Sequence, residues 1–509
     1  MNEKFFNLIL LCTAAVVSGC VSVDDEVASV PSVYWKAPKE ALPERIIEPQ
    51  QIKTNGIESA EVVSNAQNTS SQETISTPKD LTPSEKLAIG KSLSLSDLID
   101  IALENNTSTR IYWFQAKNYA AQKGKSMSAY YPQVSVGAQV YRTRTHPSYA
   151  GGLASLPIGR YYETSYGPSA EINWLLWDFG KREAQINSAE EALRAANFEY
   201  NQSLQDVVLG VNVAYFNFYS AYSSVESARL SLEDAKIAYE SAKVRTEQGV
   251  GNKQDMLNAL ANFRNAEFAL EQARSSVETA RAELAKILGV RVSANFVVST
   301  KVEMPISAEA SKKIEELTAK ALGSRQDLFA EYAKLRQTES QIKEAERNFL
   351  PQLSAYGQAS YGDYTQDGRG HQSTYTAGLS LSWSLFEGFA KKYDLISARV
   401  AKSAQAQQLK ESEISIISDV WNYYHSYLSA TKQVASTTAA VEANIEAYNA
   451  TKTAYENGVS SITEFLNAQS RLAAARKQKV SAEATLSVSV ANLAHAVGSL
   501  SATTLNMEK

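Results

Sequence analysis

The acidic residues Asp255 and Glu464 occupy equivalent places in two copies of one short sequence element. Each follows a glycine, Gly249 or Gly458, by six residues, and both copies soon continue with Leu-Asn-Ala. A constant offset of 209 residues separates the copies. A carboxylate at such a place can complement the positive N-terminus of a helix, which is worth about 0.3–1 kcal/mol. The duplication raises the question of whether the two acids do more than stabilise helices.

Cys20 is a second residue that could do chemistry, because it lies at the end of an N-terminal export signal. Segment 1–19 has a charged start, an apolar run and small residues before the cysteine, as in a secretory signal peptide. The sequence VSGC at 17–20 resembles the bacterial lipobox, whose cysteine is acylated, and each buried CH2 of an acyl chain adds about 0.8 kcal/mol of membrane affinity. The valine after the cysteine indicates outer-membrane delivery. We expect lipid attachment at Cys20, and the alternative is ordinary signal cleavage beside an incidental cysteine.

The remaining reactive residues form no catalytic or metal-binding pattern. The two cysteines are Cys12 and Cys20, and the four histidines lack the spacing of metal ligands. No glycine-rich phosphate loop, HExxH or GxSxG occurs. The chain has 509 residues and a net charge of −5, and this mild acidity gives no reason to expect nucleic acid as a partner. We expect no enzymatic activity, no cofactor and no metal.

Residues 20–91 are dominated by Ser, Thr, Asn, Gln, Glu and Pro, with little apolar periodicity. This composition predicts an extended or disordered tether behind the lipidated cysteine. No later segment offers 18 uninterrupted apolar residues, so a transmembrane helix is not expected. A chain of this kind that crosses a membrane would have to do so as a barrel.

Four segments alternate between apolar and polar residues with a period of two, which predicts β-strands with one apolar and one polar face. Two of them open with a proline, whose missing N–H is tolerated at the first residue of a strand. The predicted strands, in two consecutive pairs, cover residues 132–144 and 166–177, then 351–362 and 375–386.

These strand pairs are interpreted as two hairpins of the transmembrane-barrel type, with aromatic residues near the strand ends. The alternative is an antiparallel sheet packed on a soluble core. The export signal and the small polar residues on the second face favour the membrane. Four strands cannot close a barrel, since even small barrels need about eight, so closure demands several chains.

Helical patterns fill most of the remaining sequence and are too long for a compact domain. Residues 181 to about 247 and 391 to about 456 predict two helices of about 100 Å each, at roughly 1.5 Å per residue. Each is followed by a glycine turn and a returning helix. Shorter helices are predicted before the first strand of each pair, over 95–130 and 325–349.

Taken in order, these elements resemble the TolC-like outer-membrane efflux proteins over about residues 92–499. The features that carry the resemblance are the proline-initiated strands, the junctions NWLLWDFGKRE and SWSLFEGFAKK, and the duplicated G-V-x(6)-L-N-A element. The resemblance implies a mostly α fold with a transmembrane β part. A long α-helical barrel would continue from four β-strands per chain, which contribute to a trimeric 12-stranded β-barrel.

The same resemblance divides the chain into six segments. They are a signal peptide (1–19), a lipidated N-terminal tether (20–91), a first efflux-protein repeat (92–290), a linker (291–313), a second repeat (314–499) and a C-terminal tail (500–509).

The resemblance also assigns roles at the helix tips. Gly249 and Gly458 would lie at the periplasmic tip, where helix pairs converge and close the entrance. Glu464 would form an acidic aperture ring, with three copies facing one another on the axis. Asn467 matches a second position where relatives carry an acid, so a second ring here would be uncharged.

Asp255 and Tyr455 match a pair whose hydrogen bond links neighbouring helix pairs in the closed state. An arginine that relatives carry after the second glycine is replaced here by Ser460, which removes one closing contact. The simpler interpretation is that Asp255 and Glu464 only complement helix N-termini.

The implied function is that of a passive exit duct for small molecules in a tripartite efflux system. The implied partners are two further copies in a homotrimer, a periplasmic adaptor (membrane fusion) protein, an inner-membrane RND or ABC transporter, and the lipids of the outer membrane. The chain would be lipid-anchored there, with its helices in the periplasm. One alternative is the outer-membrane component of a type I protein secretion system. Another is a lipid-anchored coiled-coil adhesin or scaffold, which would conduct no ions.

Overall fold

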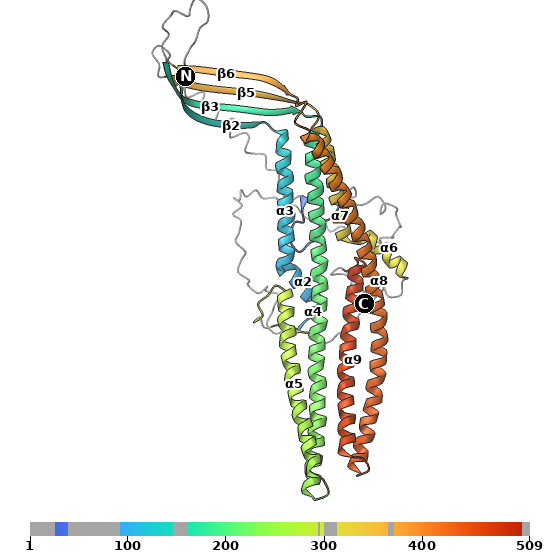
Figure 1. The fold of residues 1–509 in the computed structure, drawn as a ribbon. Helices are drawn as coiled ribbons and strands as arrows, with labels where there is room; N and C mark the ends of the chain where they lie inside the picture. The colour runs from blue at the N-terminus through green and yellow to red at the C-terminus, as the bar shows by residue number, and fades with distance from the viewer. Residues whose placement is uncertain are drawn as a thin grey trace, which may run out of the picture. The chain divides into compact units, whose positions relative to one another are not determined.

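The computed structural model describes residues 26–38, 92–145, 161–293, 296–299, 313–364 and 371–500 (Figure 1). The predicted signal peptide and Cys20 lie outside these residues, as do most of the predicted tether and tail. The elements in chain order are β1 (Ser92–Leu93), α2 (Leu95–Asn105), α3 (Thr107–Met127), η4 (Ser128–Tyr130), β2 (Gln133–Thr145), β3 (Tyr161–Trp177), α4 (Lys181–Glu247), α5 (Lys253–Ile287), β4 (Val297–Val298), α6 (Ile314–Ser324), α7 (Gln326–Arg347), β5 (Gln352–Tyr364), β6 (His371–Ser382), α8 (Ala390–Glu456) and α9 (Ile462–Ala496).

The long helices predicted from the sequence are confirmed. The helices α4 and α8 have 67 residues each, and the returning helices α5 and α9 have 35 each. At about 1.5 Å per residue, α4 and α8 extend for roughly 100 Å. None of the described helices combines the length and the apolar character that a membrane-spanning helix requires. The two halves of the chain thus repeat one hairpin of a long and a shorter helix.

The four predicted strands form one antiparallel sheet in the order β2-β3-β5-β6. Three strand limits differ from the prediction by four residues or more. The strand β3 begins at Tyr161 instead of 166, because it stays paired with β2 as far as Thr145. The strand β6 begins at His371 instead of 375 and ends at Ser382 instead of 386, because its ladder with β5 runs from His371 to Ser382.

The register gives the sheet two chemically different faces, here called the apolar face and the polar face. In one chain the apolar face is exposed, with Val140 at 75% and Leu379 at 67%, so it requires an apolar environment from elsewhere. The apolar face carries Val134, Val136, Ala138 and Val140 of β2, Pro168, Ala170, Ile172 and Trp174 of β3, Leu353, Ala355 and Ala359 of β5, and Tyr375, Ala377, Leu379 and Leu381 of β6. The polar face carries Gln133, Ser135, Gln139, Ser169, Glu171, Asn173, Ser354, Gln358, Ser360, Thr374, Thr376 and Ser380.

The turns from strand to long helix use left-handed backbone at two consecutive residues. Gly180 (φ 88°) and Gly388 (φ 61°) adopt it, which glycine does without a steric penalty because it has no Cβ. Phe179 (φ 56°) and Phe389 (φ 68°) adopt it too, which the sequence did not predict, because this conformation is unfavourable for bulky residues. Both copies of the junction therefore share one strained turn.

The single helix predicted over 95–130 is wrong, because Asn106 interrupts it. Asn106 is extended (φ −63°, ψ 129°) and ends α2. Its side-chain oxygen accepts the N–H of Ser108 at 2.8 Å, and its amide donates to the carbonyl oxygen of Ile287 at 2.9 Å. A polar residue that satisfies both neighbouring helix ends replaces the continuous helix that propensity alone suggests.

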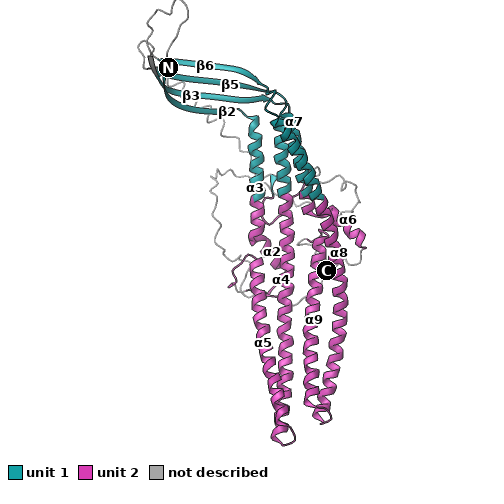
Figure 2. Ribbon diagram, viewed as in Figure 1, with its two compact units in different colours: residues 1–27, 115–196, 331–409 teal, residues 28–114, 197–330, 410–509 magenta. Residues whose placement is uncertain are grey.

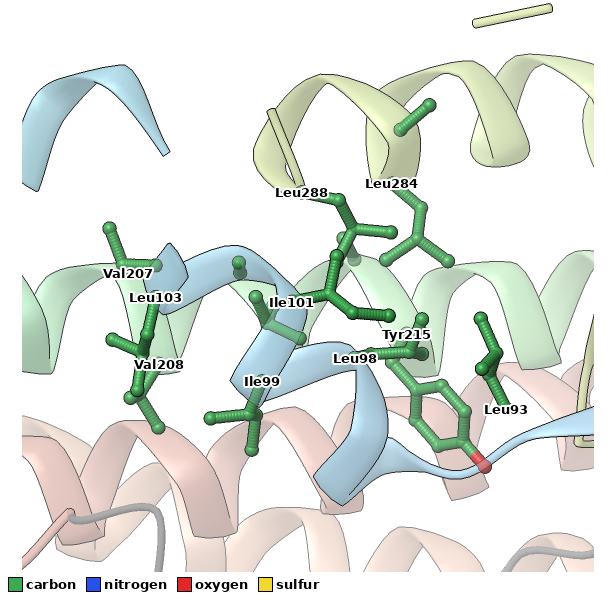
Figure 3. Close-up of a cluster of buried hydrophobic side chains, with 14 of the residues drawn as sticks. Leu93, Leu98, Ile99, Ile101, Leu103, Val207, Val208, Tyr215, Leu284 and Leu288 are labelled. Atoms are coloured by element: carbon green, nitrogen blue, oxygen red, sulfur yellow. The ribbon is translucent and has the colours of Figure 1, made fainter. Parts of the chain in front are cut away.

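The chain divides into two compact units, whose boundaries fall within α3, α4, α7 and α8 and between residues 27 and 28 (Figure 2). One unit contains the sheet, and its small buried cluster is Val27, Ala116, Ala120, Leu193 and Ala196. The other unit has a larger core around α2, where Leu98, Ile99 and Ile101 are 0–1% exposed (Figure 3). The parallel pair β1–β4 borders this core.

Part of the predicted tether, residues 26–38, packs against the helices. In the unit with the sheet, Glu26 forms a 2.6 Å ion pair with Lys123 of α3. In the other unit, the Trp35 N–H donates to the side-chain oxygen of Asn201, whose amide donates back to the Trp35 carbonyl oxygen, at 2.8 and 2.9 Å. The tether prediction missed this packing, because two bonds to one asparagine leave no periodic signal in the sequence.

Candidate functional site: the two helix tips

The duplicated element forms the same turn at both tips. After α4, Gly249 N–H donates to Thr246 and Val250 N–H to Arg245. The turn after α8 forms the two equivalent hydrogen bonds in the second copy of the element. This pattern is a Schellman motif, whose glycine must be left-handed, and Gly249 (φ 76°) and Gly458 (φ 75°) both are. The glycines predicted at the tips thus have a local structural reason.

Glu464 stabilises the start of α9. Its backbone N–H donates to the Ser461 hydroxyl and its carboxylate accepts the Ser461 N–H, both at 3.2 Å, which makes a capping box. The Ser460 hydroxyl donates to the same carboxylate oxygen. The Ser460 hydroxyl and the Ser461 N–H hold the pKa of the Glu464 carboxyl below its ordinary value, so the group stays charged at neutral and mildly acidic pH.

Glu464 is also exposed, and so is Asn467 one turn further along the same side of α9. Phe465 between them is buried, so α9 presents the acid and the amide on the face opposite its packed side. The predicted charged and uncharged positions therefore share one accessible surface of the helix.

Asp255 and Tyr455 lie in the two different hairpin tips. Asp255 is in the first turn of α5, where Asn252 is the N-cap residue. Tyr455 is 7% exposed and stacks on Phe465, with ring centroids 5.4 Å apart. Burial raises the pKa of the Tyr455 hydroxyl, Arg245 opposes the rise and Asp255 adds to it. Within the described part of the chain no hydrogen bond joins Asp255 to Tyr455.

Arg245 is the residue at the tips that the sequence interpretation missed. Its guanidinium Nη1 donates to the Tyr455 carbonyl oxygen at 3.0 Å and to that of Glu456 at 3.5 Å. The group also lies 5.2 Å from the centroid of the Tyr455 ring. An arginine from α4 thus caps the negative C-terminus of α8. One difference between the two copies in the sequence could have drawn attention to Arg245, since the corresponding residue of the second copy is Ala454.

A second set of polar contacts joins the hairpins further from the turns. The Tyr448 hydroxyl donates to Asp234 at 3.1 Å, and Arg476 forms a 3.2 Å ion pair with the same carboxylate. These three side chains connect α4, α8 and α9. The Asn262 amide donates to the Gln469 side chain at 3.0 Å and connects α5 with α9. The tips are therefore held together by separable polar contacts around a small apolar cluster of eight buried residues: Ala238, Ala242, Ala259, Tyr448, Tyr455, Ile462, Phe465 and Leu472.

The arrangement at the tips can hold or release helix hairpins and can present charge. Among the described residues, no group of three His, Cys, Asp or Glu side chains is placed to hold a metal ion. The polar contacts at the tips are ion pairs, helix caps and amide hydrogen bonds. Contacts of these kinds act mechanically and electrostatically.

The chain combines two long helical hairpins with acidic tips and a sheet that is apolar on one face and polar on the other. This combination defines an outer-membrane channel. The family model described as "Outer membrane efflux protein" matches residues 98–290 and 317–499, and the chain belongs to this family. It is an outer-membrane efflux channel and not an enzyme.

Individual relatives agree with this assignment. The chain is 26% identical to protein CyaE of Bordetella pertussis (strain Tohama I) over 420 residues, which cover 81% of this chain and 86% of the relative. It is 26% identical to the outer membrane protein TolC of Vibrio cholerae serotype O1 over 321 residues, 62% of this chain and 73% of the relative. The crystal structure of the Campylobacter jejuni CmeC outer membrane channel has a similar fold, with a TM-score of 0.66 at 18% identity, over 80% of this chain and 85% of that one.

The contact made by Arg245 gives a first prediction. In Arg245→Ala the last carbonyls of α8 lose a charged donor, so amide hydrogen exchange at residues 454–461 should become faster, by roughly tenfold. Hydrogen exchange measured by mass spectrometry on the purified protein checks this. Arg274→Ala removes a 60% exposed arginine of α5 and should leave those amides unchanged. Equal exchange in Arg245→Ala and the native protein would show that the contact does not hold the tips.

Proposed function

We propose that three copies of the chain close one channel, and that the polar face of each sheet lines its lumen. The observation that carries this proposal is the four-stranded sheet with two chemically distinct faces and two open edges, β2 and β6. One chain leaves the backbone groups at both edges without strand partners. A neighbouring copy can supply them, because β2 and β6 run in opposite directions and would continue the antiparallel alternation.

The channel would act as a passive exit duct for small molecules. It would receive them from a periplasmic adaptor protein and an inner-membrane RND or ABC transporter, which supplies the energy. The family assignment and the long helical hairpins support this role. The division of the chain into signal, tether, two repeats, linker and tail also stays a prediction.

The helix tips would form the periplasmic entrance of this duct. Three copies of Glu464 around the axis would attract cations and repel anions, and three copies of Asn467 would form an uncharged second level. The exposure of both side chains on one face of α9 supports this role. Mutual repulsion of the carboxylates would raise the pKa of Glu464, against the lowering by Ser460 and Ser461. Asp255 and Tyr455 would face each other between hairpins and respond to gate opening.

Glu464→Gln separates the gate role from the helix-capping role. Glutamine also completes a capping box, so the helix start is kept while the charge is lost. In planar bilayers the native protein should conduct ions and be blocked by divalent cations from the periplasmic side. The variant should conduct with block weakened by about tenfold or more, the loss expected when several carboxylates around one site are neutralised.

The matched control is Asp97→Asn, which neutralises the capping-box acid of α2, away from the tips. It should keep the native block. An unchanged block in Glu464→Gln would remove this residue from the gate. A native protein without any conductance would contradict the channel proposal and favour the pore-free scaffold.

We further propose that Cys20 carries the lipid anchor. The lipobox-like sequence at 17–20 supports this, and so does the position of Glu26, which Lys123 fixes near the end of α3 and the start of β2. Five residues lie between Cys20 and Glu26, and the six residue steps reach at most about 20 Å. An acylated Cys20 would then lie within reach of the membrane surface at which the strands begin.

Substitution of this cysteine tests the anchor. Cys20→Ala should lose all metabolic labelling by a radioactive or clickable fatty acid, because the thiol that the lipobox presents for acylation is gone. The serine-for-cysteine change Cys12→Ser, inside the signal, is the control and should keep the label. Label retained in Cys20→Ala would show that the lipobox interpretation is wrong.

A further inference from the structure

Two arginines follow the apolar residues of β2 on the same face of the sheet. Val134, Val136, Ala138 and Val140 alternate along this strand, and Arg142 and Arg144 continue the alternation. The β2–β3 ladder is paired residue by residue from Gln133 to Thr145 without a bulge, so neither arginine changes sides. Both side chains are exposed. The apolar face therefore ends, at its loop end, in two arginines whose backbone positions are about 7 Å apart along the strand.

Aromatic side chains mark the two borders of the apolar face. At the helix end, the Trp174 indole N–H donates to the Tyr130 carbonyl oxygen at 3.0 Å, and Trp383 makes the equivalent bond to Phe349. Toward the loop end, Tyr166 and Tyr361 are 44% and 41% exposed. Tryptophan and tyrosine concentrate at the two interfaces of a membrane. Arg142 lies two pairs beyond the row that contains Tyr166, which places it at the level of lipid headgroups.

The energetics of a charged side chain on a lipid-facing strand agree with this depth. An arginine there is costly at the middle of the bilayer and nearly neutral at the interface. A pair of arginines beside an apolar stretch is thus tolerated only where headgroups begin.

In the described strands, Asp363 is the acidic residue on the apolar face, and it lies two strands away from β2. Its carboxylate accepts the Tyr166 hydroxyl at 2.7 Å and lies 3.5 Å from Nδ1 of His371. The contacts of Asp363 are thus with β3 and β6.

We propose that Arg142 and Arg144 form a binding site for the phosphate groups of a phosphorylated glycolipid in the outer leaflet. The planar guanidinium binds phosphate through paired N–H donors, which ammonium groups cannot match. The exposed apolar residues below would contact the acyl chains of the same lipid. The apolar strip and its cationic end thus match the acyl chains and the anionic head of an amphiphile. The site rests on the proposed function, because only a membrane-spanning sheet with its helices in the periplasm places the loop end in the outer leaflet.

Binding of purified lipid A tests the site. The native protein in detergent is mixed with lipid A carrying both phosphates, and the complexes are quantified by native mass spectrometry. In Arg142→Gln/Arg144→Gln the affinity should fall by about tenfold or more, since charge-assisted hydrogen bonds to phosphate are lost. Arg142→Lys/Arg144→Lys should recover part of it, because the charge returns without the planar donors.

The matched control is Arg229→Gln/Arg274→Gln, which removes two exposed arginines from α4 and α5 and should bind as the native protein does. Dephosphorylated lipid A should bind the native protein as weakly as the intact lipid binds the double glutamine variant. Equal binding of intact lipid A to the native protein and that variant would overturn the site, and so would equal binding of the two lipids to the native protein.

Bilayer conductance of the same preparations separates the two proposals. If the double glutamine variant conducts like the native protein and binds lipid A equally well, the phosphate site is wrong and the channel stands. If the native protein neither conducts nor binds lipid A, the proposed function fails together with the site.

Discussion

The open edges of the four-stranded sheet are the constraint on which the rest of the structure depends. At β2 and β6 a row of backbone N–H and C=O groups has no strand partner among the described residues of one chain. In an apolar medium each such group costs several kcal/mol, so the edges must be paired before the exposed apolar face can enter a membrane. The proposed pairing between copies would satisfy both requirements at once, because it would turn every apolar face outward and every polar face inward.

The duplication of the chain supplies one building unit twice, and small differences give the copies different tasks. Both tips use the same left-handed glycine, yet only α4 carries an arginine at the place where α8 has Ala454. That arginine caps the neighbouring hairpin. The acids differ as well, since Glu464 completes a capping box while Asn252 serves as the N-cap residue before Asp255. One tip holds its neighbour and the other presents charge.

Most of the fold followed from the sequence because its signals are periodic. Alternation located the strands, and runs of helix formers between glycines located α4, α5, α8 and α9. The misses depend on contacts between distant parts of the chain, as in the bond of Asn106 to Ile287 and in the pairing that extends β3 and β6 toward their loops. Arg245 was missed for the same reason, since a spacing cannot reveal that it lies against Tyr455. At the candidate site, sequence comparison between the two copies located the turns and the acids, while their contacts required coordinates.

The pairing of β6 with β2 of the next copy is tested most directly by disulfide cross-linking. One cysteine is placed on β2 at Val136 or Val140, and one on β6 at Tyr375 or Leu379, in a Cys20→Ser background. Cβ atoms of facing residues in paired strands lie close enough for a disulfide at the matching register. The account predicts that one of these combinations gives a covalent species of three linked chains, and no larger species, on a non-reducing gel. Bonds formed only within single chains, or a ladder that continues beyond three, would contradict it.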